Sequence, residues 1–123
     1  MPSRLLVAKE LADILKVIAH PDRIRLIEEL RPGEQDVNTL SQVLNLPGPR
    51  ISQHFSLMRA HRLVEERREG RRHLYRLIQP EIAEWIVEGI GFIEARPTLP
   101  KSAIESVKEL WTKDERHVRD DKK

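Results

Sequence analysis

Residues 37–77 read VNTLSQVLNLPGPRISQHFSLMRAHRLVEERREGRRHLYRL, and this stretch decides the fold. Its beginning, residues 37–45, predicts a short helix, because apolar side chains recur at helical spacing and Asp36 or Asn38 is suited to cap the first turn. Asn45 tolerates the left-handed backbone that a tight turn between two helices requires. The side chains expected to face inward are Leu40, Val43 and Leu44.

A second helix is expected to begin near Pro49, because the preceding Leu46-Pro47-Gly48 cannot lie inside a helix. One face of this helix is apolar and the other is polar. The apolar face carries Ile51, Phe55 and Met58, and the polar face carries Arg50, Gln53, His54 and Arg59. Two short helices joined by a tight turn, the second polar on one side, indicate a helix-turn-helix.

The end of the stretch predicts a β-hairpin. Residues 65–68 and 71–78 have the composition of short strands, and Glu69-Gly70 provides the turn between them. Alternating side chains are expected in the second strand, with His73, Tyr75 and Leu77 on one side and Leu74 and Arg76 on the other. We interpret this hairpin as a wing beside the helix-turn-helix.

Two helices precede the stretch. The first covers about residues 5–19, where apolar residues follow the i, i+3, i+4 and i+7 spacing of one helical stripe. His20-Pro21-Asp22 ends it, and Pro21 suits the first turn of the next helix, where its missing N–H costs nothing. Arg31-Pro32-Gly33 ends the second helix.

The helix that Pro80 opens has the strongest apolar stripe in the chain, and such a stripe requires a partner surface. We interpret it, with the first helix, as a homodimer interface; alternatively, the stripe packs on the chain's own core. The interface residues expected are Leu11, Leu15, Ile82, Trp85, Ile86, Ile90 and Ile93. A linker at residues 96–100, a final helix from Lys101 and a charged tail complete the chain, so we predict a winged-helix domain over residues 1–96 and an appended segment over residues 97–123.

Basic charge is concentrated in one part of the chain. The formal net charge is only +2, but the window from Pro49 to Arg76 holds eight arginines against three glutamates, a net +5. Arginine suits bidentate contacts with phosphate and with guanine. An arginine-rich surface also serves solubility, but its concentration in one window favours a surface that binds a polyanion.

Duplex DNA is the predicted ligand. Gln53 can form a bidentate pair with adenine and Arg50 with guanine, whereas wing arginines suit phosphate or the minor groove. Ser52 alternatively bonds to its own helix, and His54 alternatively contacts phosphate. The candidate DNA-binding residues are Pro49, Arg50, Ser52, Gln53, His54, Ser56, Arg59, Arg67, Arg68, Arg71 and Arg72.

Several other classes of function are not expected. The chain has no cysteine, which excludes disulfides and thiolate metal sites and agrees with a cytoplasmic location. No segment approaches the roughly 20 apolar residues that span a membrane, and no phosphate loop, nucleophile motif or zinc-protease spacing indicates an enzyme. No cofactor is expected; one option is nickel or zinc bound by His117 with Asp114 and Glu115, or with glutamates of a second subunit.

A series of motifs runs in order through residues 5–95. They are His20-Pro21-Asp22-Arg23-Ile24-Arg25-Leu26, Leu44-Asn45-Leu46, Ile51-Ser52-Gln53-His54-Phe55, Leu57-Met58-Arg59, Leu63-Val64, Arg67-Arg68-Glu69-Gly70-Arg71 and Tyr75-Arg76-Leu77. Together they resemble the ArsR-type (ArsR/SmtB-like) family of winged helix-turn-helix transcriptional repressors. The resemblance implies a dimer joined by its first and penultimate helices, which represses promoters until an effector releases it.

Two positions depart from the family's pattern. Pro47 stands where a Ser or Thr helix cap is common, so we expect a stiffer turn without the phosphate contact that such a hydroxyl would make. Val37-Asn38-Thr39 stands where metal-binding members carry Cys-x-Cys, and the helix after Pro80 has glutamates but no histidine, so the standard metal sites are not expected.

The predicted protein is mainly α-helical with a β-hairpin wing, and it regulates transcription. We expect it to bind an inverted-repeat operator in duplex DNA as a homodimeric repressor. The alternative is a winged-helix module for protein–protein interaction that has weak affinity for DNA.

Overall fold

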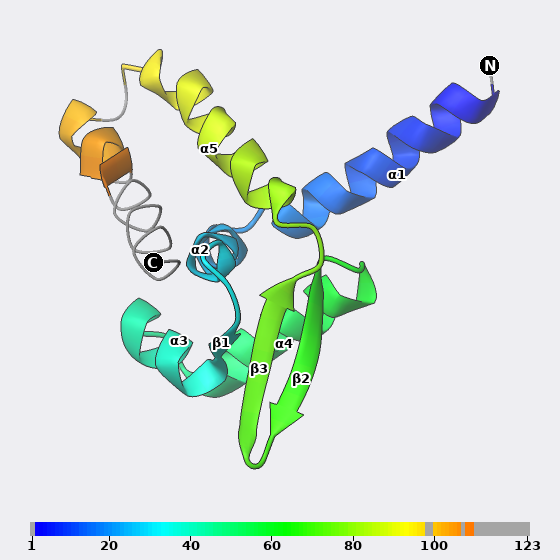
Figure 1. Cartoon of the computed structure of the whole chain (residues 1–123). Coiled ribbons are helices and arrows are strands. Elements are labelled where there is room, and N and C mark those ends of the chain that lie inside the picture. The colour runs from blue at the N-terminus through cyan, green and yellow to red at the C-terminus, as the bar shows by residue number, and fades with distance from the viewer. Residues whose placement is uncertain (1, 98–99, 107, 110–123) are drawn as a thin grey trace, which may run out of the picture. The chain divides into compact units, whose positions relative to one another are not determined.

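The computed structural model describes residues 2–97, 100–106 and 108–109 of the chain. The elements follow one another in the order α1 (Pro2–Ile18), α2 (Pro21–Leu30), β1 (Gln35–Asp36), α3 (Val37–Leu44), α4 (Gly48–Ala60), β2 (Val64–Glu69), β3 (Arg72–Leu77) and α5 (Glu81–Glu94) (Figure 1). The predicted mainly helical fold with a β-hairpin is confirmed. None of the described helices combines the length and apolar character needed to cross a membrane.

The chain divides into two compact units, Met1–Gln79 and Pro80–Lys123. The first unit holds the helix-turn-helix and the sheet, and the second begins with α5. This division precedes α5, whereas the predicted domain boundary follows residue 96. That boundary stays a prediction.

The helix-turn-helix consists of α3 and α4 with three residues between them. Asp36 begins α3, because its carboxylate accepts a hydrogen bond of 2.6 Å from the Thr39 N–H. Asn45 ends α3 in the predicted left-handed conformation, with φ 54° and ψ 49°. The Ser41 hydroxyl then donates to the Leu46 carbonyl at 2.6 Å and closes the turn. Pro47 precedes α4 without any side-chain cap, as expected.

The core of the first unit lies beneath α4. The apolar face predicted for this helix is confirmed, since Ile51, Phe55 and Met58 have no exposed surface. They belong to a core that also includes Leu26, Ile27, Leu30, Leu40, Leu44, Val64, Leu74 and Leu77. Val43 is the exception among the predicted inward residues, because its side chain is 56% exposed. It lies about 100° around α3 from Leu44, which places it beyond the buried edge of this short helix.

The sheet has three antiparallel strands in the order β1-β3-β2. Strands β2 and β3 form the predicted hairpin, and Gly70 supplies the positive φ, 63°, of its tight turn. The short strand β1 was not predicted; it pairs Gln35 with Tyr75. Leu74 and Tyr75 are both buried, although the alternation along β3 places them on opposite sides. Adjacent residues of a strand point to opposite faces, so both faces of the central strand are covered here.

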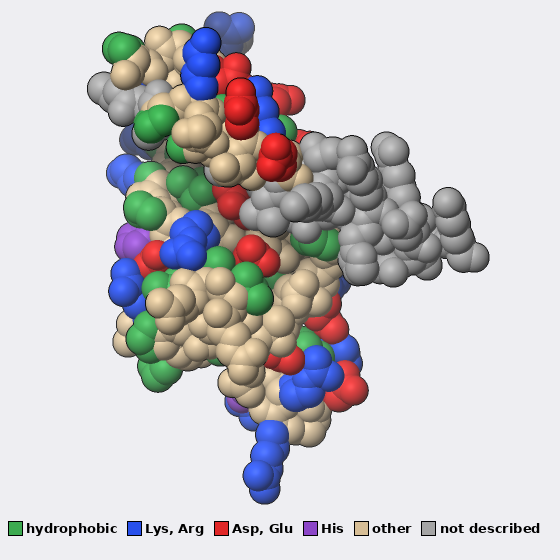
Figure 2. All heavy atoms as spheres, turned by 90° about the vertical axis from the view of Figure 1, so that its left-hand side faces the viewer, with side chains coloured by type: hydrophobic (Ala, Val, Ile, Leu, Met, Phe, Trp, Pro, Cys, Tyr) green, Lys and Arg blue, Asp and Glu red, His purple; other side chains and the backbone are tan. Residues whose placement is uncertain are grey.

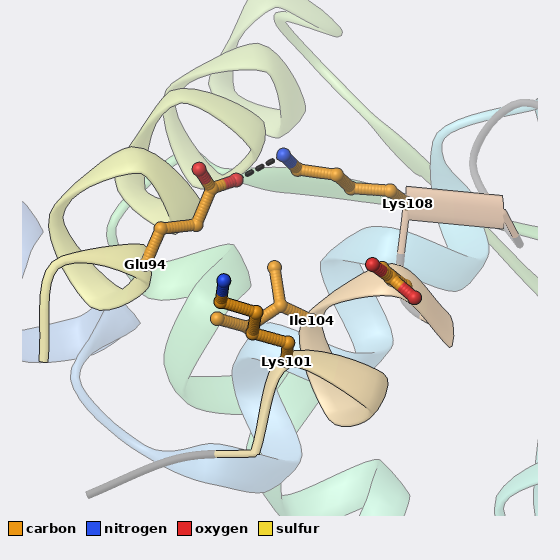
Figure 3. A pocket seen from close by; sticks show the side chains of 5 residues that line it. Glu94, Lys101, Ile104 and Lys108 are labelled. Atoms are coloured by element: carbon orange, nitrogen blue, oxygen red, sulfur yellow. Dashed lines mark ion pairs between the residues drawn. The ribbon is translucent and has the colours of Figure 1, made fainter. Parts of the chain in front are cut away.

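In the second unit, the described part of the segment after α5 is helical at residues 101–106, where a final helix was predicted. Ile104 packs with Ile90 of α5, and Ile86 and Val87 lie against this pair. Lys108 forms an ion pair with Glu94 across a pocket of about 200 Å³ (Figure 3). The charged tail, predicted at residues 114–123, lies outside the described residues.

Candidate nucleic-acid interface and candidate dimer surface

The solvent-facing side of α4 offers neutral hydrogen-bonding groups. Gln53 and Ser56 are exposed, and neither side chain has a polar partner among the described residues. Pro49 is exposed in the first turn, and Ser52 is half-buried. The local cause is the helical period, which turns Gln53 and Ser56 away from the buried stripe of Ile51 and Phe55.

Arg50 is not free to contact DNA, because it forms an ion pair within the chain. Its guanidinium Nη2 lies 2.6 Å from Oδ2 of Asp22, a buried carboxylate in the first turn of α2. The Arg50 side chain remains 52% exposed. It can therefore reach solvent, but only at the expense of this ion pair.

His54 does not lie on the exposed polar face where the sequence placed it. Its side chain is 11% exposed, its ring lies 4.6 Å from the His20 ring, and its Nδ1 accepts a hydrogen bond of 3.2 Å from Arg23 Nε. Burial, followed by the nearby His20 and Arg23, lowers the pKa of His54. The prediction that His54 faces solvent is wrong, because His20, Asp22 and Arg23, at the start of α2, lie against its ring.

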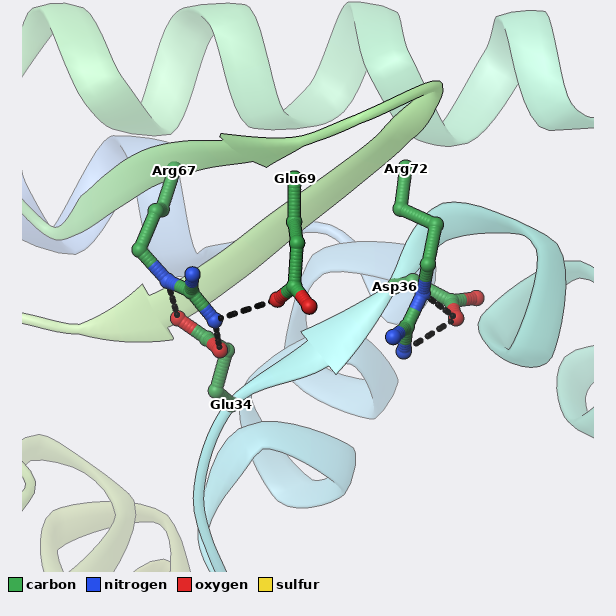
Figure 4. Close-up of polar contacts among 5 residues, drawn as sticks. All are labelled: Glu34, Asp36, Arg67, Glu69 and Arg72. Carbon is green, nitrogen blue, oxygen red and sulfur yellow. Dashed lines mark hydrogen bonds and ion pairs between the residues drawn. The ribbon is translucent and has the colours of Figure 1, made fainter.

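Two of the wing arginines are held by carboxylates that precede α3. Arg67 forms a two-point contact with Glu34, at 2.6 and 3.1 Å, and also approaches Glu69 at 3.1 Å (Figure 4). Arg72 contacts Asp36 through Nε and Nη2, at 3.2 and 3.0 Å. The hydrogen bond from Arg67 lowers the pKa of Glu34, and the Thr39 backbone N–H is the main cause of the lowered pKa of Asp36. These acidic partners offset much of the wing's basic charge.

Glu66 is the carboxylate that lies beside two further predicted arginines, Arg59 and Arg68. Arg59 lies 3.4 Å from it and Arg68 lies 3.5 Å from it, and the Tyr75 hydroxyl donates to its Oε2 at 2.7 Å. This Tyr75 hydrogen bond is the main cause of the lowered pKa of Glu66. Burial, and then Glu66, raise the pKa of Tyr75 to about 12. The Tyr75 ring also stacks on Phe55, which joins the wing to α4.

Arg71 differs from the other wing arginines. Among the described residues it has no hydrogen bond or ion pair, and it occupies the hairpin turn. Basic side chains stand at the lower end of Figure 2, where the tip of the hairpin lies. Arg71 also lines a pocket of about 140 Å³ together with Asn38 and Ser52. The structure thus brings the tip of the wing, the start of α3 and the first half of α4 to one place.

The acidic partners of these arginines are far from them along the chain. Asp22, Glu34 and Asp36 are separated by about 28 to 36 residues from the arginines they pair with. Neither spacing nor composition indicates such pairs, because they depend on how α2, β1 and the hairpin pack together.

Apolar side chains are exposed on both elements predicted to form a dimer interface. In α1, Leu11 and Leu15 are 41% and 48% exposed, and Leu5, Leu6 and Val7 are exposed as well. In α5, Trp85 is 51% exposed and Ile93 is 36% exposed, whereas Ile82 and Ile86 are partly buried. Ile90 is only 8% exposed, because Ile104 packs against it within the chain, so little of its side chain is available to a partner.

The metal option at His117, with Asp114 and Glu115, lies outside the described residues. His20, Asp22 and His54, which the sequence alone does not join in one group, bring three potential ligand atoms within 4.8 Å of one another.

A helix-turn-helix with a polar second helix and an arginine-bearing wing defines the class of winged helix-turn-helix transcription regulators. Comparison with known proteins points to the same class of protein. The model of the bacterial regulatory protein arsR family matches residues 20–66. A biofilm growth-associated repressor from Agrobacterium fabrum is 35% identical over 90 residues, which cover 73% of this chain and 76% of that protein.

Two solved structures share the fold. The transcriptional repressor BigR from Xylella fastidiosa has 30% identity and a TM-score of 0.65, covering 77% of this chain and 96% of BigR. The homodimeric winged helix-turn-helix DNA-binding domain Mb0332 from Mycobacterium bovis has 22% identity and a TM-score of 0.64, covering 79% of this chain and 94% of that domain.

The chain belongs to the ArsR family of bacterial regulatory proteins. This is a family of transcription regulators and not of enzymes, as the sequence predicted. The chain spans only 58% of the length of the transcriptional repressor SmtB from Mycobacterium tuberculosis, to which it is also similar.

Proposed function

We propose that this protein is a sequence-specific repressor that binds duplex DNA as a homodimer. The observation that carries the proposal is the exposed polar face of α4, where Gln53 has no partner within the described chain. An exposed amide on a recognition helix can pair with both N6 and N7 of adenine in the major groove. The membership in the ArsR family supports the same function.

We assign different contacts to α4 and to the wing. Gln53, and Arg50 once it leaves Asp22, read base edges. Arg71 contacts phosphate or the minor groove, and it lines a pocket with Asn38 and Ser52 in which the Asp36 carboxylate is paired with Arg72. Arg67 and Arg72 contribute less, because Glu34 and Asp36 already neutralise them. His54 is omitted because it is almost buried.

The exposed apolar residues of α1 and α5 support dimerisation. Leu11, Leu15 and Trp85 lie in water in the isolated chain, and covering such side chains with a second copy is favourable. The related domain Mb0332 is homodimeric. A twofold dimer presents two copies of α4, so the operator is an inverted repeat.

The first test is selection from random duplex DNA by the purified protein, with the oligomeric state measured by light scattering. Enrichment of an inverted repeat by a dimer supports the proposal. A monomer that enriches no sequence, and whose DNA binding vanishes at moderate salt, contradicts it and favours a protein–protein interaction module.

A second test addresses the interface. Trp85→Glu places a charge in the proposed dimer contact and should yield monomers. Val43→Glu is the matched control, because Val43 is similarly exposed on α3 but is outside the proposed interface. If Trp85→Glu remains dimeric, the interface assignment is wrong.

A further inference from the structure

Three side chains with metal-binding groups meet between α2 and α4. His20 caps the start of α2, Asp22 lies in its first turn, and His54 projects from α4. Their ligand atoms all lie within 4.8 Å of one another. Within residues 2–97, 100–106 and 108–109, no other group of three such side chains is this close.

Two atoms of this cluster lack hydrogen bonds. Asp22 Oδ2 and His54 Nε2 are buried, have no hydrogen-bond partner among the described residues, and lie 3.5 Å apart. Arg50 approaches Asp22 Oδ2 at 2.6 Å, but this ion pair lacks hydrogen-bonding geometry. Because Nδ1 accepts from Arg23, Nε2 carries the ring proton and faces the Asp22 carboxylate at 3.5 Å, which is too long for a good hydrogen bond. These two buried atoms are therefore poorly satisfied, and a ligand that binds both would be favourable.

We propose that His20, Asp22 and His54 form a binding site for a first-row divalent metal ion, for which zinc is the probe. Two imidazoles, one carboxylate and a water molecule are an ordinary ligand set for such an ion. Ligands about 2.0–2.1 Å from a tetrahedral zinc ion lie about 3.4 Å apart. Asp22 Oδ2 and His54 Nε2 already have this spacing, so His20 is the ligand that must move closer.

Metal binding changes the partners of two arginines. The ion takes the place of the Arg50 guanidinium at Asp22, and Arg50 is half-exposed and can turn into solvent. Coordination through His54 Nε2 also requires the ring proton to reside on Nδ1, which now accepts from Arg23. Arg23 therefore gives up this bond and keeps its other bond, to the Val17 carbonyl. His20 likewise gives up the hydrogen bond that its Nδ1 accepts from the Asp22 N–H, because either ring nitrogen can bind the ion only if Nδ1 stops accepting.

The exchange at Asp22 gives the site a regulatory consequence, which rests on the proposed function. Arg50 is a candidate base-contacting residue, and Asp22 restrains it in the metal-free arrangement. An ion at Asp22 releases Arg50 toward the DNA-facing side of α4. The metal site itself does not depend on DNA binding, so a titration without DNA tests it separately.

The experiment is calorimetric titration of the full-length protein with zinc, in the absence of DNA, followed by cobalt substitution and its visible absorption spectrum. Asp22→Asn removes the charged ligand, and His20→Asn removes an imidazole while keeping a residue that caps helices well. His61→Asn is the matched control, because His61 is exposed at the end of α4. Circular dichroism checks that each variant is folded.

The expected result is one zinc per chain, with affinity reduced on the order of tenfold or more by Asp22→Asn and by His20→Asn but unchanged by His61→Asn. Arg50→Ala should bind zinc severalfold more tightly, because it removes the cation that competes for Asp22. The proposal is overturned if the native chain binds no zinc. It is also overturned if folded Asp22→Asn and His20→Asn chains bind zinc as the native chain does, or if Arg50→Ala weakens binding.

Discussion

Helix α4 and the β2–β3 hairpin differ in how much of their polar surface is free to bind a ligand. On α4, Gln53 and Ser56 are exposed and have no polar partner in the described chain. On the hairpin, Arg67 and Arg72 are more than half exposed, yet each is held by a carboxylate at 2.6–3.2 Å. Arg71 alone among the described wing arginines has no such partner.

This difference shows that exposure and formal charge do not measure the capacity to bind DNA. A guanidinium that already contacts a carboxylate must exchange one anion for another, whereas Gln53 exchanges only water. The basic window of the sequence therefore overstates the charge available at the wing. The following predictions test this contrast, beginning with the contact that holds the two regions together.

Phe55→Ala should have the largest effect, because Phe55 is fully buried and stacks on Tyr75 with ring centroids 4.1 Å apart. The free energy of unfolding should fall by about 3–5 kcal/mol. Urea unfolding followed by circular dichroism measures this change. Phe92→Ala is the matched control, since Phe92 is exposed on α5 and its loss should change stability by no more than about 0.5 kcal/mol. Equal effects of the two substitutions would contradict this view of the core.

Gln53→Ala should weaken binding to the selected operator by about 1–3 kcal/mol and relax specificity at one base pair in each half-site. Fluorescence anisotropy with operators substituted at single positions measures both effects. A uniform loss on all sequences would mean that Gln53 contacts the backbone and not a base.

Arg71→Ala should weaken binding to all duplexes alike and reduce the slope of log affinity against log salt by about 0.9 for each phosphate that Arg71 neutralises. Arg67→Ala is the comparison, because Arg67 is paired with Glu34 and should change the slope less. If both variants lower the slope equally, the pairing seen at the wing does not limit its contact with DNA.

Tyr75→Phe should cost about 1 kcal/mol near neutral pH, because it removes the hydrogen bond to Glu66 and keeps the stacking on Phe55. The pKa of Glu66 is lowered in the folded state, so this stability is present above its ordinary pKa of 4.5 and is lost as pH falls through the lowered value. The free energy of unfolding of the native protein and of Tyr75→Phe, measured between pH 3 and pH 7, tests this effect. A difference that stays constant over this range would show that ionised Glu66 is not involved.

Glu34→Gln should have the smallest effect, a modest gain in affinity for all duplexes, because it removes one of the two carboxylates that hold Arg67 and leaves only Glu69. Glu10→Gln removes the same charge from α1 and serves as the control for net charge. Titrations at low salt, where charge effects are largest, compare the two. If Glu10→Gln produces the same gain, the release of Arg67 does not account for it.

Much of the fold was predictable because it depends on local periodicity and on backbone preferences. Ile51, Phe55 and Met58 mark the buried face of α4 by spacing alone, and Asn45 and Gly70 mark positive-φ turns. The single error in α3, Val43, arises because a helix of two turns has too few residues to define the edge of its buried face.

The order of helices, turn and hairpin, and the polar side of α4, follow from local sequence, since each depends on neighbours within a few residues. Which polar groups are free follows from how the elements pack together. The pairs Asp22–Arg50 and Glu34–Arg67, the burial of His54, and the cover that Ile104 gives Ile90 all join separate elements. Such contacts depend on how elements pack in three dimensions, and ion pairs act over a few ångströms of space regardless of distance along the chain.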